Sequence, residues 1–221
     1  MADQSDDGLI REVNEELREE QMKQLWQRYG GYVVGLALVI VIIVAGYQGW
    51  KQYDISTRSS EGEQFYAAQQ LLRSGSDAQA MTAMRTLAGE ASTGYGMLAQ
   101  FQEAALLAKQ GDAASAASIY KQIARKNTGN VALSGLANIL GVMVEVNAGG
   151  YERQALELRL STIAEDGHPY RHSARELLGV IALDAGDAAK AREAFTQLAG
   201  DASAPQGLRE RASSLLQNLG S

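Results

Sequence analysis

The stretch Leu177–Leu198, LLGVIALDAGDAAKAREAFTQL, decides the fold, because two alanine-rich apolar segments are joined in it by a Gly-Asp turn. Alanine and leucine favour helix, glycine commonly ends a helix, and aspartate commonly caps the start of the next one. The stretch therefore predicts a helix, a tight turn and a second helix of similar length.

The same pattern recurs along the chain at nearly constant intervals. Turn glycines stand at Gly75, Gly111, Gly149 or Gly150, and Gly186; counted through Gly149, their separations are 36, 38 and 37 residues. A single helical hairpin cannot bury its apolar face, so several such units must stack on one another. This periodicity predicts an α-solenoid of stacked helical hairpins.

The residues around the turns also match in size. A small residue on each helix lets the two antiparallel helices of a hairpin approach closely, and a large residue one turn later fills the gap toward the next hairpin. Aligning the Gly-Asp turns superposes Ala104 on Gly179, Ala116 on Ala191 and Tyr120 on Phe195, and the first unit places Ala68, Ala80 and Met84 at the same positions.

A second feature is the run Tyr29–Trp50, YGGYVVGLALVIVIIVAGYQGW, which contains no charge. As a helix it would be about 33 Å long, close to the ~30 Å hydrocarbon core of a bilayer. A core helix would rarely need so long an uncharged run, and a signal peptide has a short basic leader and roughly 7–15 apolar residues. We therefore expect an uncleaved membrane anchor. Aromatic residues at its two ends fit the two headgroup regions: Trp26, Tyr29 and Tyr32, then Tyr47, Trp50 and Tyr53.

The charges that flank this run predict its orientation. Four bases lie on the N-terminal side within about twenty residues, against two on the C-terminal side, Lys51 and Arg58. Because cytoplasmic flanks carry the excess of lysine and arginine, the N-terminus is expected in the cytoplasm. We therefore predict a single-pass protein of a bacterial inner membrane, with its C-terminal domain in the periplasm.

The expected organisation has four parts. Residues 1–28 form an acidic juxtamembrane helix with a cap at Ser5 to Asp7, residues 29–50 form the transmembrane anchor, residues 51–60 form a linker, and residues 61–221 form the repeat domain. The fold class is all-α: a transmembrane helix, then about four helical hairpins and a C-terminal capping helix. The acidic helix has two interpretations, a solvated juxtamembrane segment or a docking helix for a cytoplasmic partner.

Composition excludes several function classes. The net charge is −6, with no basic cluster after the apolar run, so nucleic-acid binding is not expected. The chain has no cysteine, which removes disulfides, thiol nucleophiles and cysteine-ligated metals.

The remaining candidates for chemistry are weak. His168 and His172 are four residues apart, but Pro169 belongs in the first turn of a helix, so the two rings need not share a face and no metal site is expected. The Gly94–Ala99 segment has the spacing G-x-G-x-x-A, yet it lacks the preceding strand that a dinucleotide site needs. We predict no catalytic, cofactor-binding or metal-binding residues, no cofactor, and no enzyme activity.

The turn pattern resembles the tetratricopeptide repeat (TPR), on the strength of Leu178, Gly179, Gly186, Asp187, Ala191 and Phe195. One N-terminal anchor followed by about four divergent TPR units resembles a bacterial family, the YfgM-like ancillary subunits of the SecYEG translocon. That resemblance implies a periplasmic TPR domain beside the Sec channel, in the company of a membrane-anchored periplasmic chaperone of the PpiD type.

The expected function is that of a non-enzymatic, membrane-tethered scaffold or chaperone-like adaptor near the Sec translocon. The partners that the resemblance implies are the SecYEG translocon, the PpiD-type chaperone and emerging polypeptides, besides membrane lipid. Two alternatives stay open. One is a structural subunit or assembly factor of another inner-membrane complex, with the span packed through Gly31 and Gly35. The other is a hydrolase with an unrecognised site.

Overall fold

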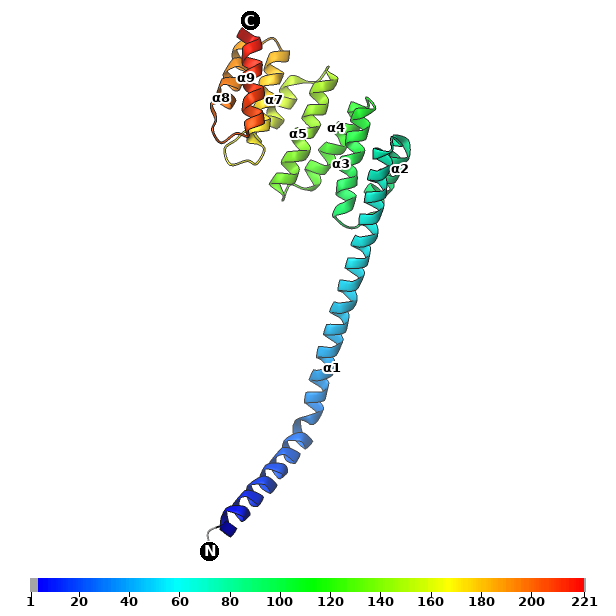
Figure 1. The fold of residues 1–221 in the computed structure, drawn as a ribbon, viewed down its shortest axis with the longest axis vertical. Coiled ribbons are helices and arrows are strands. Elements are labelled where there is room, and N and C mark those ends of the chain that lie inside the picture. The colour runs from blue at the N-terminus through cyan, green and yellow to red at the C-terminus, as the bar shows by residue number, and fades with distance from the viewer. Residues whose placement is uncertain (1–3, 221) are drawn as a thin grey trace. The chain divides into compact units, whose positions relative to one another are not determined.

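The computed structural model describes the backbone of residues 4–220 and the side chains of residues 22–220 (Figure 1). In the described chain the structure is helical, with short connections and no strand. The helices are α1 (Gln4–Arg73), α2 (Asp77–Glu90), α3 (Gly94–Lys109), α4 (Ala113–Lys126), α5 (Val131–Ala148), α6 (Arg153–Ser161), α7 (Arg171–Asp184), α8 (Ala188–Gly200) and α9 (Gln206–Gly220).

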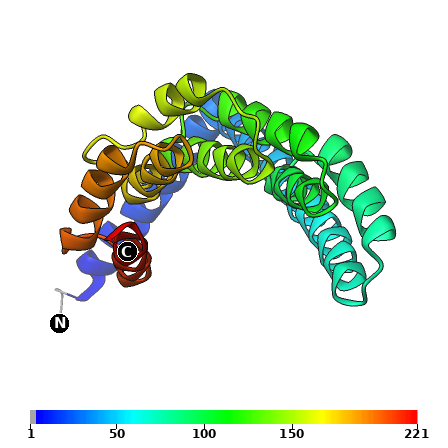
Figure 2. The ribbon, with the colours of Figure 1, turned by 90° about the horizontal axis from the view of Figure 1, so that it is seen from above.

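The chain divides into two compact units, Met1–Thr57 and Arg58–Ser221. In the second unit the end of α1 pairs with α2, and the pairs α3–α4, α5–α6 and α7–α8 follow, before α9 packs on α8. Figure 2 shows these hairpins along an arc, with α3, α5, α7 and α9 on its inner side and α2, α4, α6 and α8 on its outer side. The predicted all-α, TPR-like solenoid with a final capping helix is confirmed.

Three of the turns have one geometry, and the predicted glycines form them. Gly75, Gly111 and Gly186 have φ angles of 77°, 87° and 77°, in the left-handed region that glycine adopts without strain. In the last of these turns the Asp187 N–H donates to the carbonyl of Ala182, five residues back, over 2.9 Å. This is the 6→1 hydrogen bond of a Schellman motif, and equivalent bonds close the other two turns.

The predicted small and large positions are buried between the helices. A Cβ atom on Gly179 would lie 2.6 Å from a ring carbon of Phe195, so only glycine lets α7 and α8 approach this closely. Phe195 is fully buried and packs with residues of α9 as well as α7. The other aligned positions are also buried: Ala68, Ala80, Met84, Ala104, Ala116, Tyr120 and Ala191.

The third hairpin, α5–α6, has a longer turn than the others, which makes its sequence the hardest to align with the other repeats. Its turn is two residues longer than the others, because Gly149 and Gly150 both take positive φ and α6 begins only after the cap residue Glu152. Counted from that cap, the small and large positions fall on Leu156 and Leu160, and both are buried. The unit therefore keeps the repeat register but fills it with leucine.

A buried carboxylate joins the start of the repeat unit to its second hairpin. Glu61, on α1, is 7% exposed and accepts hydrogen bonds from the backbone N–H groups of Ser92 and Thr93, over 2.8 and 3.2 Å, and from both of their hydroxyls. Thr93 is the N-cap of α3, where the helix dipole favours a negative charge. Burial alone raises the pKa of the Glu61 carboxyl, but these hydrogen bonds outweigh it and lower the pKa below its ordinary value.

In the first unit, the described part of α1 carries a run of exposed apolar side chains. The large aliphatic side chains from Val33 to Val44 are each at least 50% exposed. Residues Met22–Arg73 are long and apolar enough to cross a membrane, by length and composition. Helix α5, Val131–Ala148, passes the same test although it packs within the repeat unit.

Two details of the expected organisation differ in the structure. Residues 51–60, expected as a linker, continue α1 as helix, and the division between the two units falls among them, after Thr57. Helix α1 begins at Gln4, so Ser5 to Asp7 lie in its first turn rather than before it. The side chains of the predicted cap are outside the described residues, as are those of most of the acidic helix.

Candidate binding groove

An apolar groove of about 440 Å³ lies in the repeat unit. It lies between α5, α7 and α9, three helices that Figure 2 shows on the inner side of the second unit. Its lining is mostly apolar, and its only charged residues come from α7 and α9. The lining residues are Ile139, Met143, Val146, Asn147, Ser173, Glu176, Leu177, Val180 and Arg211.

The two charged residues of the groove neutralise each other. Arg211 donates from Nε to Glu176 Oε1 over 2.7 Å and from a terminal nitrogen to Oε2 over 3.0 Å. Bidentate pairs of this kind are strong and directional, and this one ties α9 to α7 across the groove. Because no charge is left unpaired, the groove is suited to an uncharged, apolar segment rather than to a carboxylate or a basic group.

The groove residues occupy equivalent positions of the repeat. Met143 and Val180 each directly follow the buried small-position residue of their helix, Val142 and Gly179. Sequence reasoning did not identify these residues, although the repeat register contained the signal: on a helix, the residue after a buried one points roughly 100° away from it. Met143 is 42% exposed, so part of its apolar side chain is open to solvent at the groove.

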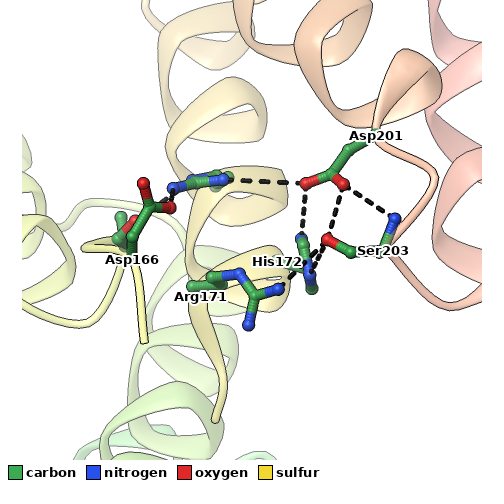
Figure 3. A network of polar contacts seen from close by, with 7 residues as sticks. Asp166, Arg171, His172, Asp201 and Ser203 are labelled. Atoms are coloured by element: carbon green, nitrogen blue, oxygen red, sulfur yellow. Dashed lines mark hydrogen bonds and ion pairs between the residues drawn. The ribbon is translucent and has the colours of Figure 1, made fainter. Parts of the chain in front are cut away.

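A polar network joins α7 to the connection that precedes it and to the connection between α8 and α9 (Figure 3). His172 is 5% exposed, and its Nδ1 lies 3.4 Å from Asp201 Oδ2, close enough for attraction but without hydrogen-bond geometry. Its Nε2 lies 3.5 Å from the hydroxyl of Ser203, which itself donates to Asp201 Oδ1 over 2.6 Å. Arg175 contacts Asp201 at 3.8 Å and donates to Asp166 over 2.7 Å.

This set contains serine, histidine and aspartate but is not arranged for nucleophilic catalysis. A catalytic serine must donate its proton to the histidine, whereas the Ser203 hydroxyl donates to Asp201. The Ser203 backbone N–H also donates to Asp201, over 2.9 Å, which closes a local turn. The network joins the α8–α9 connection to α7.

The two histidines lie in different surroundings, as expected. The Nδ1 of His168 accepts from the Tyr170 N–H over 3.1 Å, and its ring lies over Gly135 of α5, whereas His172 faces the α8–α9 connection. Among the described residues no group of histidines and carboxylates could hold a metal ion. One expectation was wrong: α7 begins at Arg171, so Pro169 precedes the helix instead of standing in its first turn.

The Gly94–Ala99 segment is the beginning of α3, with Thr93 as its cap. It follows helix α2, not a strand, so the geometry that aims a dinucleotide loop is missing here. Gly96 is instead needed for packing, because a Cβ there would lie 3.0 Å from the carbonyl oxygen of Ala91.

Comparison with known proteins agrees with this geometry. The model of the tetratricopeptide repeat-like domain family matches residues 23–221, nearly the whole chain. The chain belongs to the tetratricopeptide repeat-like domain family. Domains of the tetratricopeptide repeat-like type are generally non-catalytic modules that bind other proteins. No curated protein and no solved structure matches the chain.

The family match starts at residue 23, so it includes the apolar segment as well as the repeats. The anchor-like helix is thus part of the pattern that the family shares. Within the repeats, the groove between α5, α7 and α9 is an apolar hollow lined by residues of three helices.

Proposed function

We propose that this protein is a membrane-tethered, non-enzymatic scaffold that binds uncharged apolar polypeptide segments in the groove between α5, α7 and α9. The observation that carries the proposal is the groove itself: it is apolar, partly open at Met143, and its one ion pair is internal. Surfaces of this kind bind protein segments through apolar side chains seated in pockets.

The tether is the second part of the proposal. The exposed apolar side chains from Val33 to Val44 would be covered by lipid, and the aromatic residues Tyr32 and Trp50 would lie at the two headgroup regions. The bias of flanking bases favours an N-terminus in the cytoplasm and the repeats outside it, in the periplasm of a bacterium. A tether raises the effective concentration of the groove near the membrane, so weak binding is sufficient.

The resemblance to the YfgM-like family supplies the specific partners. In this proposal the groove serves as a chaperone-like adaptor beside the SecYEG translocon, together with a PpiD-type membrane-anchored chaperone. Exported polypeptides emerge unfolded with their apolar side chains exposed, which matches the lining of the groove. Tethering at the inner membrane would hold the groove where these chains appear.

A reporter fusion tests the placement. A reporter that is active only outside the cytoplasm, fused after Ser221, is expected to be active, and the same reporter fused before Met1 is expected to be inactive. Both fusions must sediment with the membrane fraction, which controls for failed insertion. A cytoplasmic readout from the Ser221 fusion would overturn the translocon part of the proposal.

A further inference from the structure

His172 lies on the side of α7 that faces away from the groove. Its neighbour Ser173 and Glu176, one turn further on, line the groove, while His172 points to the connection between α8 and α9, as Figure 3 shows. That connection carries Asp201 and Ser203. The same short segment of α7 therefore contacts the groove on one side and the α8–α9 connection on the other.

The position of α9 depends on this connection. Ala204, in the connection, is 4% exposed and packs with Ala212 of α9 against the preceding hairpin, and Leu208 of α9 is also buried. Arg211, between them in sequence, forms one wall of the groove through its pair with Glu176. If the connection separated from α7, α9 would lose its support and the groove would lose that wall.

Without a proton on His172, the four charged side chains around it sum to zero net charge. Arg171 and Arg175 on α7 face it, as do Asp166 in the α6–α7 connection and Asp201 in the α8–α9 connection. Arg175 contacts both carboxylates, and Arg171 donates to the Ser203 hydroxyl over 3.1 Å. A protonated His172 would be attracted to Asp201, whose Oδ2 lies 3.4 Å from Nδ1, but that carboxylate already accepts from Ser203 and contacts Arg175. The proton would therefore add one net positive charge at a site that is almost closed to water.

We propose that His172 is a pH-sensitive latch, which when neutral keeps the α8–α9 connection on α7 and when protonated releases that connection and α9. The latch regulates access to the groove, so its biological role rests on the proposed function. Acidification would open the α9 wall and expose the apolar lining to a larger partner, or release a bound one.

The direction of the effect follows from the environment of the ring. Burial, and then the positive charge of Arg171, lower the pKa of His172 below its ordinary value of 6.5, although Asp201 acts in the opposite sense. The released state therefore binds a proton more readily than the latched state. The latched state is most stable above pH 6.5 and loses stability as the pH falls below it, by up to about tenfold in the opening equilibrium per pH unit.

Hydrogen exchange of the full-length protein in detergent micelles tests the latch. Peptides from α9 are followed at pH 7.5, 6.5 and 5.5, and their rates are divided by the intrinsic exchange rates at each pH. Their protection is expected to fall about five- to tenfold between pH 7.5 and 5.5, while protection of α4 stays within twofold. Unchanged protection of α9 would contradict the proposal.

Two variants assign the effect to one histidine, since the chain has only two. His172→Gln cannot take a proton, so its α9 protection is expected to be the same at all three pH values. His168→Gln removes the other ring, whose pKa burial also lowers, and is expected to keep the wild-type response. A response that survives in His172→Gln, or disappears in His168→Gln, would overturn the assignment.

A measurement on His168→Gln covers the case in which His172→Gln does not fold. The ring of His172 then gives the only histidine resonance, and its titration midpoint is expected below pH 6.5, over the same interval in which α9 loses protection. A midpoint at or above 6.5 would contradict the latch. These experiments use no partner, so they can fail while partner binding in the groove stands, and partner binding can fail while the latch stands.

Discussion

Replacing Gly179 with valine is expected to lower the free energy of unfolding by about 3 kcal/mol. The new Cβ would lie 2.6 and 2.9 Å from two ring carbons of Phe195, closer than real Cβ contacts allow. Phe195 cannot move aside, because it is fully buried between α7 and α9 with Ala191 and Leu198. The helices themselves would have to separate, and the measurement is urea denaturation of the full-length protein in detergent, followed by circular dichroism.

The matched control is Gly89→Val. Gly89 also lies in a helix, α2, but it is exposed, and nothing lies within 4 Å of the Cβ position. Because valine has a slightly higher helix propensity than glycine, this change is expected to alter stability by no more than about 0.5 kcal/mol. Equal effects at the two positions would show that the close approach of α7 and α8 is not what Gly179 provides.

Replacing Glu61 with alanine is expected to cost about 2 kcal/mol, measured by the same denaturation experiment at pH 7. The change leaves four donors of Ser92 and Thr93 without their shared acceptor at the start of α3. Glu63→Ala is the matched control, since Glu63 is exposed on the same helix, and its effect is expected to stay within about 0.5 kcal/mol.

The contribution of Glu61 to the stability of the protein is expected to decrease at low pH. Because its folded-state pKa is lowered, its stabilising effect is complete above the ordinary carboxyl value of 4.5 and is lost as the pH falls below that value. The stability difference between the wild type and Glu61→Ala is therefore expected to be constant from pH 7 to 5 and to shrink at pH 4. A difference that does not change at pH 4 would mean that the hydrogen bonds do not depend on the charge.

The hairpin turns could be predicted because their signals are local. Glycine at a left-handed position and aspartate at the following cap are neighbours in sequence, so Gly111 with Asp112 and Gly186 with Asp187 were sufficient. The third hairpin was harder because a second glycine, Gly150, lengthens its turn and moves its helix by two residues. The repeat register of α6 was also harder to recognise because Leu156 occupies the position that a small residue takes in the other hairpins.

The parts that sequence reasoning missed depend on residues far apart in the chain. The hydrogen bonds of Glu61 reach 31 and 32 residues along the sequence, and nothing around Glu61 marks it as different from the exposed Glu63. His172 meets Asp201 across a whole hairpin in the same way. Met143 could have been found by counting one residue beyond each buried small position, but it first had to be known that the turn begins at Gly149 and not at Gly150.

Photo-crosslinking from the groove tests the central claim most directly. A photoreactive residue replaces Met143, which is exposed in the groove, or Leu158, which is 72% exposed on the outer helix α6. In intact cells, Met143 is expected to yield adducts with translocon subunits, a membrane-anchored periplasmic chaperone or exported polypeptides, identified by mass spectrometry, and Leu158 several times fewer. Adducts in equal amounts from both positions, or none of these partners from Met143, would contradict the account.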